Sequence, residues 1–209
     1  MSSAPPRPIP DLAKPPLVIE TPRLVLRPIA LTDVEELWPY VSDPELPKMM
    51  SWDPHVDRTE TVAFVQRQID GLANGTDVTW AMVHEGRAAG VIGLGGITWQ
   101  FRAWRVDRAE LGYWLAPRLW RQGLVSEAAL HATQWAFETL GLHKITIGCV
   151  EGNVASQRII EKLGYRFLAI FEEDFWRFGR WQAHRRYELT APEWTDSART
   201  MRFSRPSRP

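Results

Sequence analysis

The chain has 209 residues, of which 44% are hydrophobic, and its 25 lysines and arginines balance 25 aspartates and glutamates. Length and apolar content predict one folded domain with a sizeable core, whereas zero net charge argues against nucleic acid and anionic membranes, which select basic surfaces. The single cysteine excludes an intramolecular disulfide. No apolar run approaches the roughly 18 residues that span a bilayer, so we expect a cytoplasmic protein without a membrane partner.

The two ends of the chain differ in composition from the rest. Residues 1–16 contain six of the 16 prolines, and we expect a disordered leader there. Residues 196–209 are rich in arginine, serine and proline and are expected to form a disordered tail. Between them, residues 17–195 show no internal repeat and are predicted to form a single domain.

The domain opens on two β-favouring segments, residues 17–19 and 23–27. A first helix is predicted from Thr32 and Glu35, which have the spacing of a capping box, and Pro39 should kink it or end it early. A second helix is predicted between a cap at Asp57 and a stop near Gly71.

The later elements alternate between strands and helices. Further β-favouring segments are predicted at 79–84, 89–97, 109–115, 144–150, 165–171 and 184–190. The residues just before 109 form a polar stretch of Trp, Arg and Asp outside these segments. Helices with apolar residues at helical spacing are predicted at 126–140 and 153–163, each stopped by a glycine. This order predicts a mixed α/β sheet.

One junction in this pattern carries chemistry. The strand over residues 110–115 leads through a short turn to a helix start, where free backbone N–H groups meet the positive end of the helix dipole. Gly123 would let the backbone approach a pyrophosphate, Arg121 would add charge, and Ser126 would add a hydroxyl donor. Many helix starts contain glycine and bind nothing, so the junction alone leaves both interpretations open.

Five ordered motifs carry a resemblance to a known family. They are Glu-Thr-Pro-Arg-Leu-Val-Leu-Arg-Pro at 20–28, Glu-Leu-Gly-Tyr-Trp-Leu at 110–115, Trp-Arg-Gln-Gly-Leu-Val-Ser-Glu-Ala at 120–128, Asn-Val-Ala-Ser at 153–156 and Glu-Lys-Leu-Gly-Tyr at 161–165. Together they resemble the GNAT N-acetyltransferases, and within them the RimJ and RimL branch. The resemblance implies an α/β fold with about four helices and a mixed, mostly antiparallel sheet of six or seven strands. It also implies that the sheet is splayed between its fourth and fifth strands, with acetyl-CoA in the opening.

The resemblance assigns the contacts to acetyl-CoA. Backbone groups at the strand end would bind the pantetheine arm, and the turn before the helix would bind the pyrophosphate. Trp120 and Val125 depart from the family's phosphate motif, although backbone N–H donation does not depend on the side chain. The cofactor-binding residues implied are Trp114, Leu115, Arg121, Gln122, Gly123, Leu124, Val125, Ser126, Asn153 and Ser156.

Two residues are candidates for catalysis. The resemblance places the Ser156 hydroxyl near the sulfur, able to protonate the departing thiolate, although Asn153 and Ser156 also fit ordinary helix capping. Glu110 is the candidate base and attracts the ammonium form of the substrate; the alternative is a carboxylate paired with an arginine. Cys149 is interpreted as a small buried hydrophobe. The five histidines have no metal-ligand spacing and no carboxylate partner evident from the sequence, so no metal is predicted.

The acceptor side is predicted from two segments that combine acidic and aromatic residues. Residues 49–53 lie between the first two helices, and residues 172–176 lie between the last two strands. Such residues suit an amine by charge attraction and cation–π contact, while solvated loop charges are the alternative. The acceptor contacts expected are Trp52, Asp53, Glu110 and Trp176.

Three functions follow from these expectations. The first is transfer of acetyl from acetyl-CoA to a primary amine, foremost an α-amino group of a protein or peptide, by direct attack in a ternary complex. The second is acetylation of a small-molecule amine, and the third is a non-catalytic acyl-CoA-binding regulator. A homodimer is common in the family, but the sequence identifies no self-complementary patch. Of the 11 tryptophans, we expect Trp38, Trp80 and Trp135 to pack in the core.

Overall fold

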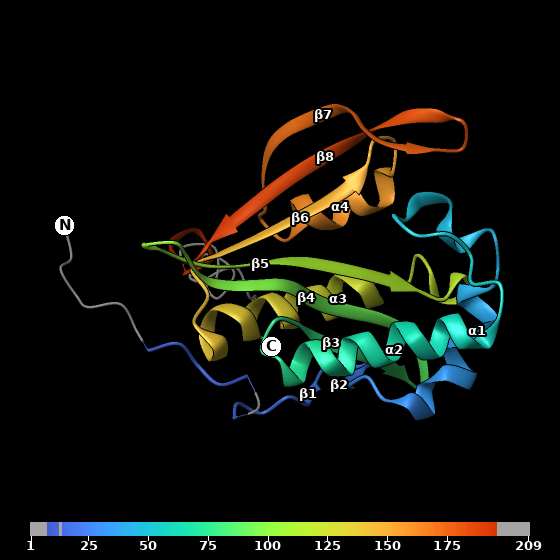
Figure 1. Cartoon of the computed structure of the whole chain (residues 1–209), viewed down its shortest axis with the longest axis horizontal. Helices are drawn as coiled ribbons and strands as arrows, with labels where there is room; N and C mark the ends of the chain where they lie inside the picture. The colour runs from blue at the N-terminus through green and yellow to red at the C-terminus, as the bar shows by residue number, and fades with distance from the viewer. Residues whose placement is uncertain (1–7, 13, 196–209) are drawn as a thin grey trace, which may run out of the picture.

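The computed structural model describes residues 8–12 and 14–195. This part of the chain is built on one eight-stranded sheet in the order β1-β2-β3-β4-β5-β6-β8-β7 (Figure 1). The strands are β1 (Ile19–Glu20), β2 (Val25–Pro28), β3 (Val78–His84), β4 (Arg87–Phe101), β5 (Trp104–Leu115), β6 (Lys144–Val150), β7 (Arg166–Arg177) and β8 (Arg180–Thr190). Each β-favouring segment of the sequence therefore contributes to a strand. The sheet has more strands than the six or seven that the resemblance implied, because a turn from Thr21 to Leu24 separates β1 from β2.

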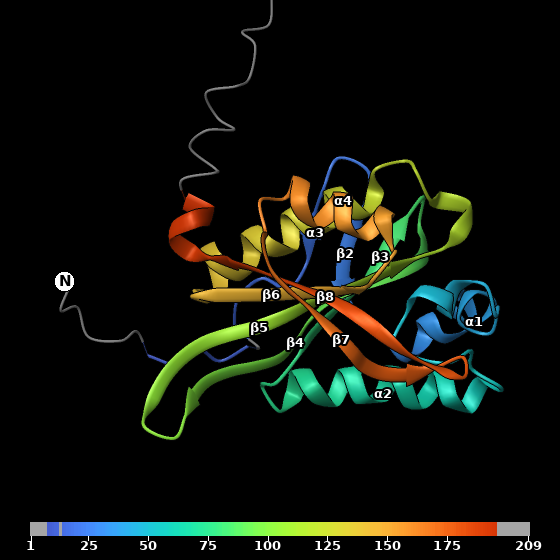
Figure 2. The same cartoon turned by 90° about the horizontal axis from the view of Figure 1, so that it is seen from above.

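Four α-helices of the described residues cover the two faces of the sheet (Figure 2). One face carries α1 (Val34–Val41) and α2 (Arg58–Ala73), and the other carries α3 (Leu124–Gln134) and α4 (Val154–Lys162). The last turns of α3 continue as a π-helix over Trp135–Leu140. Gly141 then ends the helix in a left-handed conformation at φ 79°, as predicted.

The helix starts test the capping predictions. Asp57 caps α2 by accepting hydrogen bonds from the backbone N–H groups of Thr59 and Glu60, so that prediction is confirmed. The capping box at Thr32 is wrong, because a 3₁₀ turn over Leu31–Asp33 precedes α1. Asp33 caps that turn instead, since its carboxylate accepts from the Ala30 N–H at 2.9 Å.

The sheet is splayed between β5 and β6, which are its fourth and fifth strands when the paired N-terminal strands β1 and β2 are counted as one. These two strands are parallel and pair from Arg108–Lys144 to Leu111–Ile147. Beyond that point β5 continues beside β4, and β6 continues beside β8 up to Val150, so the two halves of the sheet separate (Figure 1). The predicted position of the splay is confirmed.

Two hairpins are longer than the sequence predicted. The polar stretch before residue 109 forms part of the β4–β5 hairpin, which extends to the Phe101–Trp104 pair. Residues 172–176, expected in a loop, belong to β7, which carries a bulge between Phe171 and Phe175. In both hairpins, cross-strand pairs of aromatic and long side chains support the ladder despite the charges.

Tryptophans anchor the main core. Trp80 is fully buried and Trp135 is 5% exposed, and their rings meet edge to face at 5.2 Å. Their indole N–H groups donate to the carbonyls of Leu17 and Pro16 at 2.6 and 2.8 Å. Leu12, at 3% exposed, also packs in this core, so ordered contacts begin within the expected leader. Residues 1–7, 13 and 196–209, including the whole expected tail, lie outside the described residues.

Candidate active site

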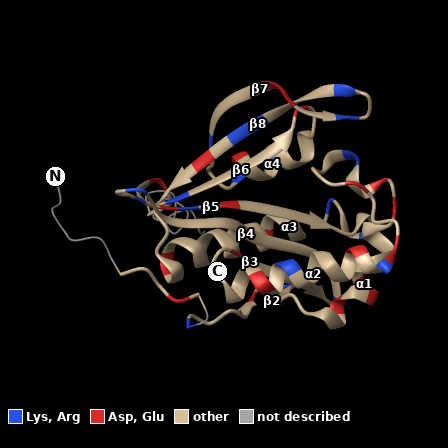
Figure 3. Cartoon of the chain, viewed as in Figure 1, with Lys and Arg blue, Asp and Glu red and all other residues tan. Residues whose placement is uncertain are grey.

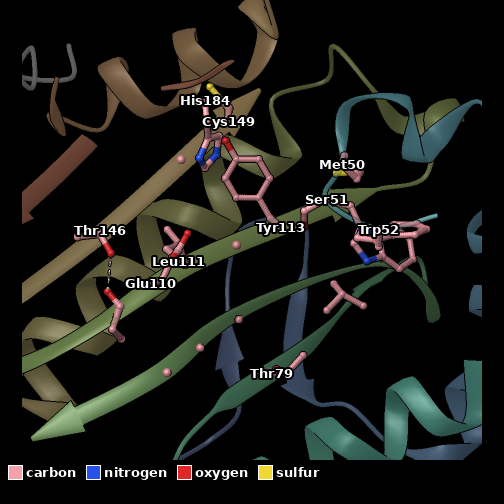
Figure 4. A pocket seen from close by; sticks show the side chains of 18 of the residues that line it. Met50, Ser51, Trp52, Thr79, Glu110, Leu111, Tyr113, Thr146, Cys149 and His184 are labelled. Atoms are coloured by element: carbon pink, nitrogen blue, oxygen red, sulfur yellow. Dashed lines mark hydrogen bonds between the residues drawn. The ribbon is translucent and has the colours of Figure 1, made fainter. Parts of the chain in front are cut away.

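A cavity of about 1010 Å³ opens where β5 and β6 separate (Figure 4). Side chains alternate along each strand, so Glu110 and Thr146, which are in register, point to the face covered by α1 and α2. Tyr113 points to the opposite face, where its hydroxyl contacts Ser156 of α4. The splay therefore joins the two faces of the sheet, and we refer to them as the acceptor face (α1–α2) and the donor face (α3–α4).

On the donor face, the turn before α3 presents unpaired backbone donors. Arg121 and Gly123 adopt left-handed conformations at φ 62° and φ 77°. Helix α3 begins at Leu124, two residues before the predicted start, and no side chain caps its first N–H groups. Such donors at the positive end of a helix dipole bind phosphate groups. The turn therefore has the free donors that a phosphate group requires.

An ion pair from the N-terminal motif holds this turn. Arg23 Nη2 lies 2.7 Å from the Glu127 carboxylate, and its Nη1 donates to the Gln122 carbonyl at 2.7 Å. Burial would raise the pKa of Glu127, but hydrogen bonds from Thr21 and Arg23 outweigh it and hold the pKa below its ordinary value. Glu127 is therefore ionised at neutral pH, and the first and third motifs are joined in space.

The two departures from the phosphate motif leave the backbone donors free. Val125 packs against the core, so its side chain points away from the turn. The Trp120 indole donates to the Leu115 carbonyl at 2.7 Å. That carbonyl, one of the backbone groups at the strand end, is thus already bonded within the chain, and Trp120 connects the turn to the end of β5.

The end of β5 still offers other backbone groups to the splay. Ala116 N donates to Ala89 O of β4 at 2.8 Å, and antiparallel ladders bond to one neighbour at every second residue. The N–H groups of Tyr113 and Leu115 therefore face β6. Trp114 points to the acceptor face instead, where its ring meets Trp52 at 6.2 Å.

Ser156 lies on the donor face, in the first turn of α4. Its hydroxyl is 3.0 Å from the Tyr113 hydroxyl, and Asn153 accepts from its backbone N–H at 3.1 Å as the cap of α4. Burial raises the pKa of Tyr113 to about 12 and that of Cys149 to about 11. Both groups are therefore protonated at neutral pH, which argues against Cys149 as a nucleophile. Tyr113 itself was not identified from the sequence, although it lies in the second motif.

Four charged or titratable side chains on the acceptor face contact one another in sequence. Glu110 is 3.2 Å from Arg186, and Arg186 is 4.0 Å from Asp174. Asp174 in turn is 3.4 Å from the imidazole of His184. The alternative interpretation of Glu110, a carboxylate paired with an arginine, describes this contact. Sequence reasoning missed the His184 pair because Asp174 reaches it through the bulge in β7, which no sequence period marks.

Comparison with known proteins decides the family. Residues 23–166 match the model of an acetyltransferase domain described as GNAT. The chain belongs to the GNAT acetyltransferases. It is therefore an N-acetyltransferase that uses acetyl-CoA.

Relatives and solved structures agree with this membership. The N-acetyltransferase YoaA of Bacillus subtilis is 24% identical over 78% of this chain and 90% of its own length. The FsC-acetyl coenzyme A-N(2)-transacetylase of Aspergillus fumigatus is 28% identical over 90% of this chain and 80% of its own. The structure of RimL, a ribosomal alpha-N-protein acetyltransferase, in complex with coenzyme A superimposes with a TM-score of 0.75 at 21% identity. It covers 83% of this chain and 97% of its own, a likeness that concerns the fold.

In this acetyltransferase the predicted acceptor residues are only partly brought together. Trp52 and Glu110 line the cavity, whereas Asp53 and Trp176 do not. The Asp53 side chain is 86% exposed. Trp176 pairs with Trp181 across the hairpin at 5.8 Å, on the opposite face from Phe175, which lines the cavity. Strand alternation, invisible while the segment was taken as a loop, explains this outcome.

Acidic and basic residues are interspersed over the acetyltransferase in the view of Figure 3. No helix in the described part of the chain combines the length and apolar character needed to cross a bilayer. Within the same residues, no three His, Cys, Asp or Glu side chains gather in a way that could hold a metal ion.

Arg177, at the end of β7, holds one wall of the acceptor cavity. Its side chain is only 10% exposed. Its guanidinium donates to the Asp53 carboxylate at 3.0 Å and to the carbonyls of Pro47, Met50 and Trp52. Because Met50 and Trp52 line the cavity, Arg177 fixes the segment after α1 against the β7–β8 hairpin.

Arg177→Ala is expected to raise the KM for the acceptor amine about tenfold while leaving acetyl-CoA affinity unchanged. Hydrogen bonds to a charged group each contribute about 1.5–3 kcal/mol, so their loss frees the wall of the acceptor cavity but not the turn at α3. Steady-state kinetics and calorimetry measure the two quantities. Arg180→Ala, an exposed arginine of the same hairpin, is the matched control. An unchanged acceptor KM in Arg177→Ala would show that the wall does not depend on this contact.

Proposed function

We propose that this enzyme acetylates the α-amino group of a protein or peptide by direct attack in a ternary complex with acetyl-CoA. The observation that carries the proposal is the size of the acceptor cavity, about 1010 Å³. Pockets for drug-sized molecules measure roughly 300–1,000 Å³, so a small amine would leave much of this one unfilled. The end of a polypeptide would fill it.

The proton balance also favours an α-amine. An α-amino group has a pKa of roughly 7.7–8.0, whereas a lysine side chain has one near 10.4, a difference worth about 4 kcal/mol. The cavity offers only modest proton acceptors: the imidazoles of His55 and His184, and the carboxylates of Glu110 and Asp174, which both face Arg186. An α-amine needs no stronger base. The name of the RimL neighbour, an alpha-N-protein acetyltransferase, supports the same acceptor class.

Each part of the site has a role in the proposed reaction. The N–H groups of residues 124–126 bind the pyrophosphate, and those of Tyr113 and Leu115 bind the pantetheine arm. The Ser156 hydroxyl, oriented by Tyr113, hydrogen-bonds the departing thiolate and protonates it. Glu110 attracts the ammonium form of the acceptor. Acetyl-CoA supplies the acyl group as an activated thioester.

A small-molecule amine is the second candidate. The FsC transacetylase, whose name describes transfer from acetyl coenzyme A to an N(2) position, matches 90% of this chain. A small acceptor would use the same donor face and occupy only part of the cavity.

A panel of acceptors with product masses tests the proposed function. The full chain is incubated with acetyl-CoA and with free peptides, N-terminally blocked peptides containing lysine, and small amines. We expect one added acetyl group on free peptides only, located at the N-terminus by fragmentation. Acetylation of blocked peptides or of small amines alone would contradict the proposal.

Glu110→Gln is expected to raise the KM for the amine about two- to fivefold, because an exposed charge contact contributes about 0.2–1 kcal/mol. The Glu110 side chain is half exposed, at 52%. Rates measured between about pH 6 and pH 9 should keep the wild-type profile. A rate loss of about a hundredfold together with loss of the acidic limb would instead make Glu110 the base.

A further inference from the structure

His184 is a partly buried imidazole held in one orientation on the acceptor face of the splay. Its side chain is 17% exposed and lines the cavity. Asp174 Oδ2 lies 3.4 Å from Nδ1, and the Phe175 ring stands perpendicular to the imidazole with centroids 6.1 Å apart. Figure 4 shows the ring among the side chains that line the cavity.

A glycine on the neighbouring strand makes room for the ring. A Cβ atom at Gly148 of β6 would lie 2.5 Å from Cε1 and 2.6 Å from Nε2 of His184. Any other residue at this position would displace the imidazole. The Nε2 edge therefore lies over the bare backbone of β6, at the point where β6 leaves β5.

The contact with Asp174 selects the tautomer. A carboxylate 3.4 Å from Nδ1 can attract an N–H group but not supply one, so the contact favours the tautomer with the proton on Nδ1 and the lone pair on Nε2. The charged groups that act on the ring are Asp174 of β7, Arg186 of β8 and Glu110 of β5, while Tyr113 and Cys149 line the same cavity from the donor face. Burial and Arg186 lower the pKa of His184 below its ordinary value, against Asp174 and Glu110, which raise it. The ring is therefore neutral at neutral pH.

Glu110 is already engaged, because its carboxylate pairs with Arg186 at 3.2 Å. The same arginine disfavours the imidazolium form of His184, which promotes release of a proton after it has been accepted. Arg186 thus affects the two groups differently.

We propose that His184 is the base that deprotonates the acceptor amine and that Asp174 is its positioning residue, an inference that rests on the proposed function. Nε2 takes one proton from the substrate ammonium and later releases it to solvent. The freed lone pair forms the C–N bond to the acyl carbon, and the C–S bond breaks with its electron pair on sulfur. The second proton lost by the nitrogen balances the proton that the thiolate gains through Ser156. The net products are the amide, the free thiol and one proton.

Kinetics of His184→Gln test the base role. We expect kcat/KM at pH 7 to fall by about a hundredfold or more, the range of general base catalysis. The acidic limb of the wild-type pH profile should disappear, and acetyl-CoA affinity should stay within about twofold. His143→Gln, a histidine exposed before β6 and outside the cavity, is the matched control and should match the wild type.

Two further variants separate positioning from chemistry. In Asp174→Asn the acidic limb should move to lower pH, because the carboxylate raises the pKa of His184. In Gly148→Ala the added methyl group should displace the His184 ring. The enzyme should then lose activity although both His184 and Asp174 are still present. Imidazole ¹⁵N chemical shifts, assigned by comparison with His184→Gln, report the tautomer without requiring catalysis. They should show the Nδ1–H tautomer in the wild type.

The outcomes distinguish failure of the base role of His184 from failure of the proposed function. An active wild type whose His184→Gln variant keeps its rate and pH profile overturns the base while leaving the proposed function intact. The Nε2–H tautomer in the resting protein also overturns it. A wild type that acetylates no amine of the panel overturns the proposed function, and the base with it.

Discussion

Gly123→Val is expected to raise the dissociation constant for acetyl-CoA at least about tenfold. Gly123 adopts φ 77° at the start of α3, where a β-branched residue is strained by roughly 1–2 kcal/mol or more. The turn would relax toward negative φ and misalign the N–H groups of residues 124–126. Calorimetry with acetyl-CoA measures the loss, which by the usual conversion is about 1.4 kcal/mol per factor of ten.

Gly86→Val is the matched control for this substitution. Gly86 has a nearly identical φ of 79° and open space around it, but it lies in the β3–β4 turn, away from α3. It should therefore lose a similar amount of stability and keep acetyl-CoA affinity. Equal affinity losses in both variants would mean that strain anywhere weakens binding, and the assignment of the pyrophosphate to this turn would fail.

Trp80→Ala is expected to lower the free energy of unfolding by about 3–5 kcal/mol, the usual cost of deleting a large buried aromatic ring. Trp80 is fully buried. The deletion also removes the contact with Trp135 at 5.2 Å and leaves the Leu17 carbonyl without its 2.6 Å donor. Since domains are stable by only about 5–15 kcal/mol, urea denaturation should show a large shift of the midpoint.

Trp104→Ala tests whether burial of the ring is responsible for the loss of stability expected in Trp80→Ala. The Trp104 side chain is 67% exposed at the tip of the β4–β5 hairpin, so its removal should change stability by no more than about 0.5 kcal/mol. If both variants shift the midpoint equally, the core does not depend on Trp80 in the way its packing indicates.

Local chemistry made much of the fold predictable. Asp57 caps α2, and Gly141 ends the helix that begins at α3, because both act through backbone geometry within a few residues. Asn153 caps α4 for the same reason. Runs of β-favouring residues located the strands, because that composition is also local.

Features that depend on distant partners were not predictable in this way. Asp33 replaces Thr32 as a cap because Arg27 on β2 pairs with its buried carboxylate at 2.5 Å. Trp176 leaves the cavity because its hairpin partner is Trp181, and Asp174 enters it through a bulge. The Leu115 carbonyl is occupied by an indole five residues later, whose orientation depends on how the turn folds. None of these pairings leaves a period or a motif in the sequence.

The limited pairing of β5 with β6 determines how substrates could be exchanged. Four register pairs, from Arg108 to Leu111, hold the strands together. Beyond them the two strands separate, and the gap between them connects the two faces of the sheet. In the proposed reaction, coenzyme and acceptor enter from opposite faces of the sheet and meet only in this gap. Neither entrance is covered by the other molecule, so each product can depart without waiting for its partner. The order of release then reflects relative affinity and not obstruction.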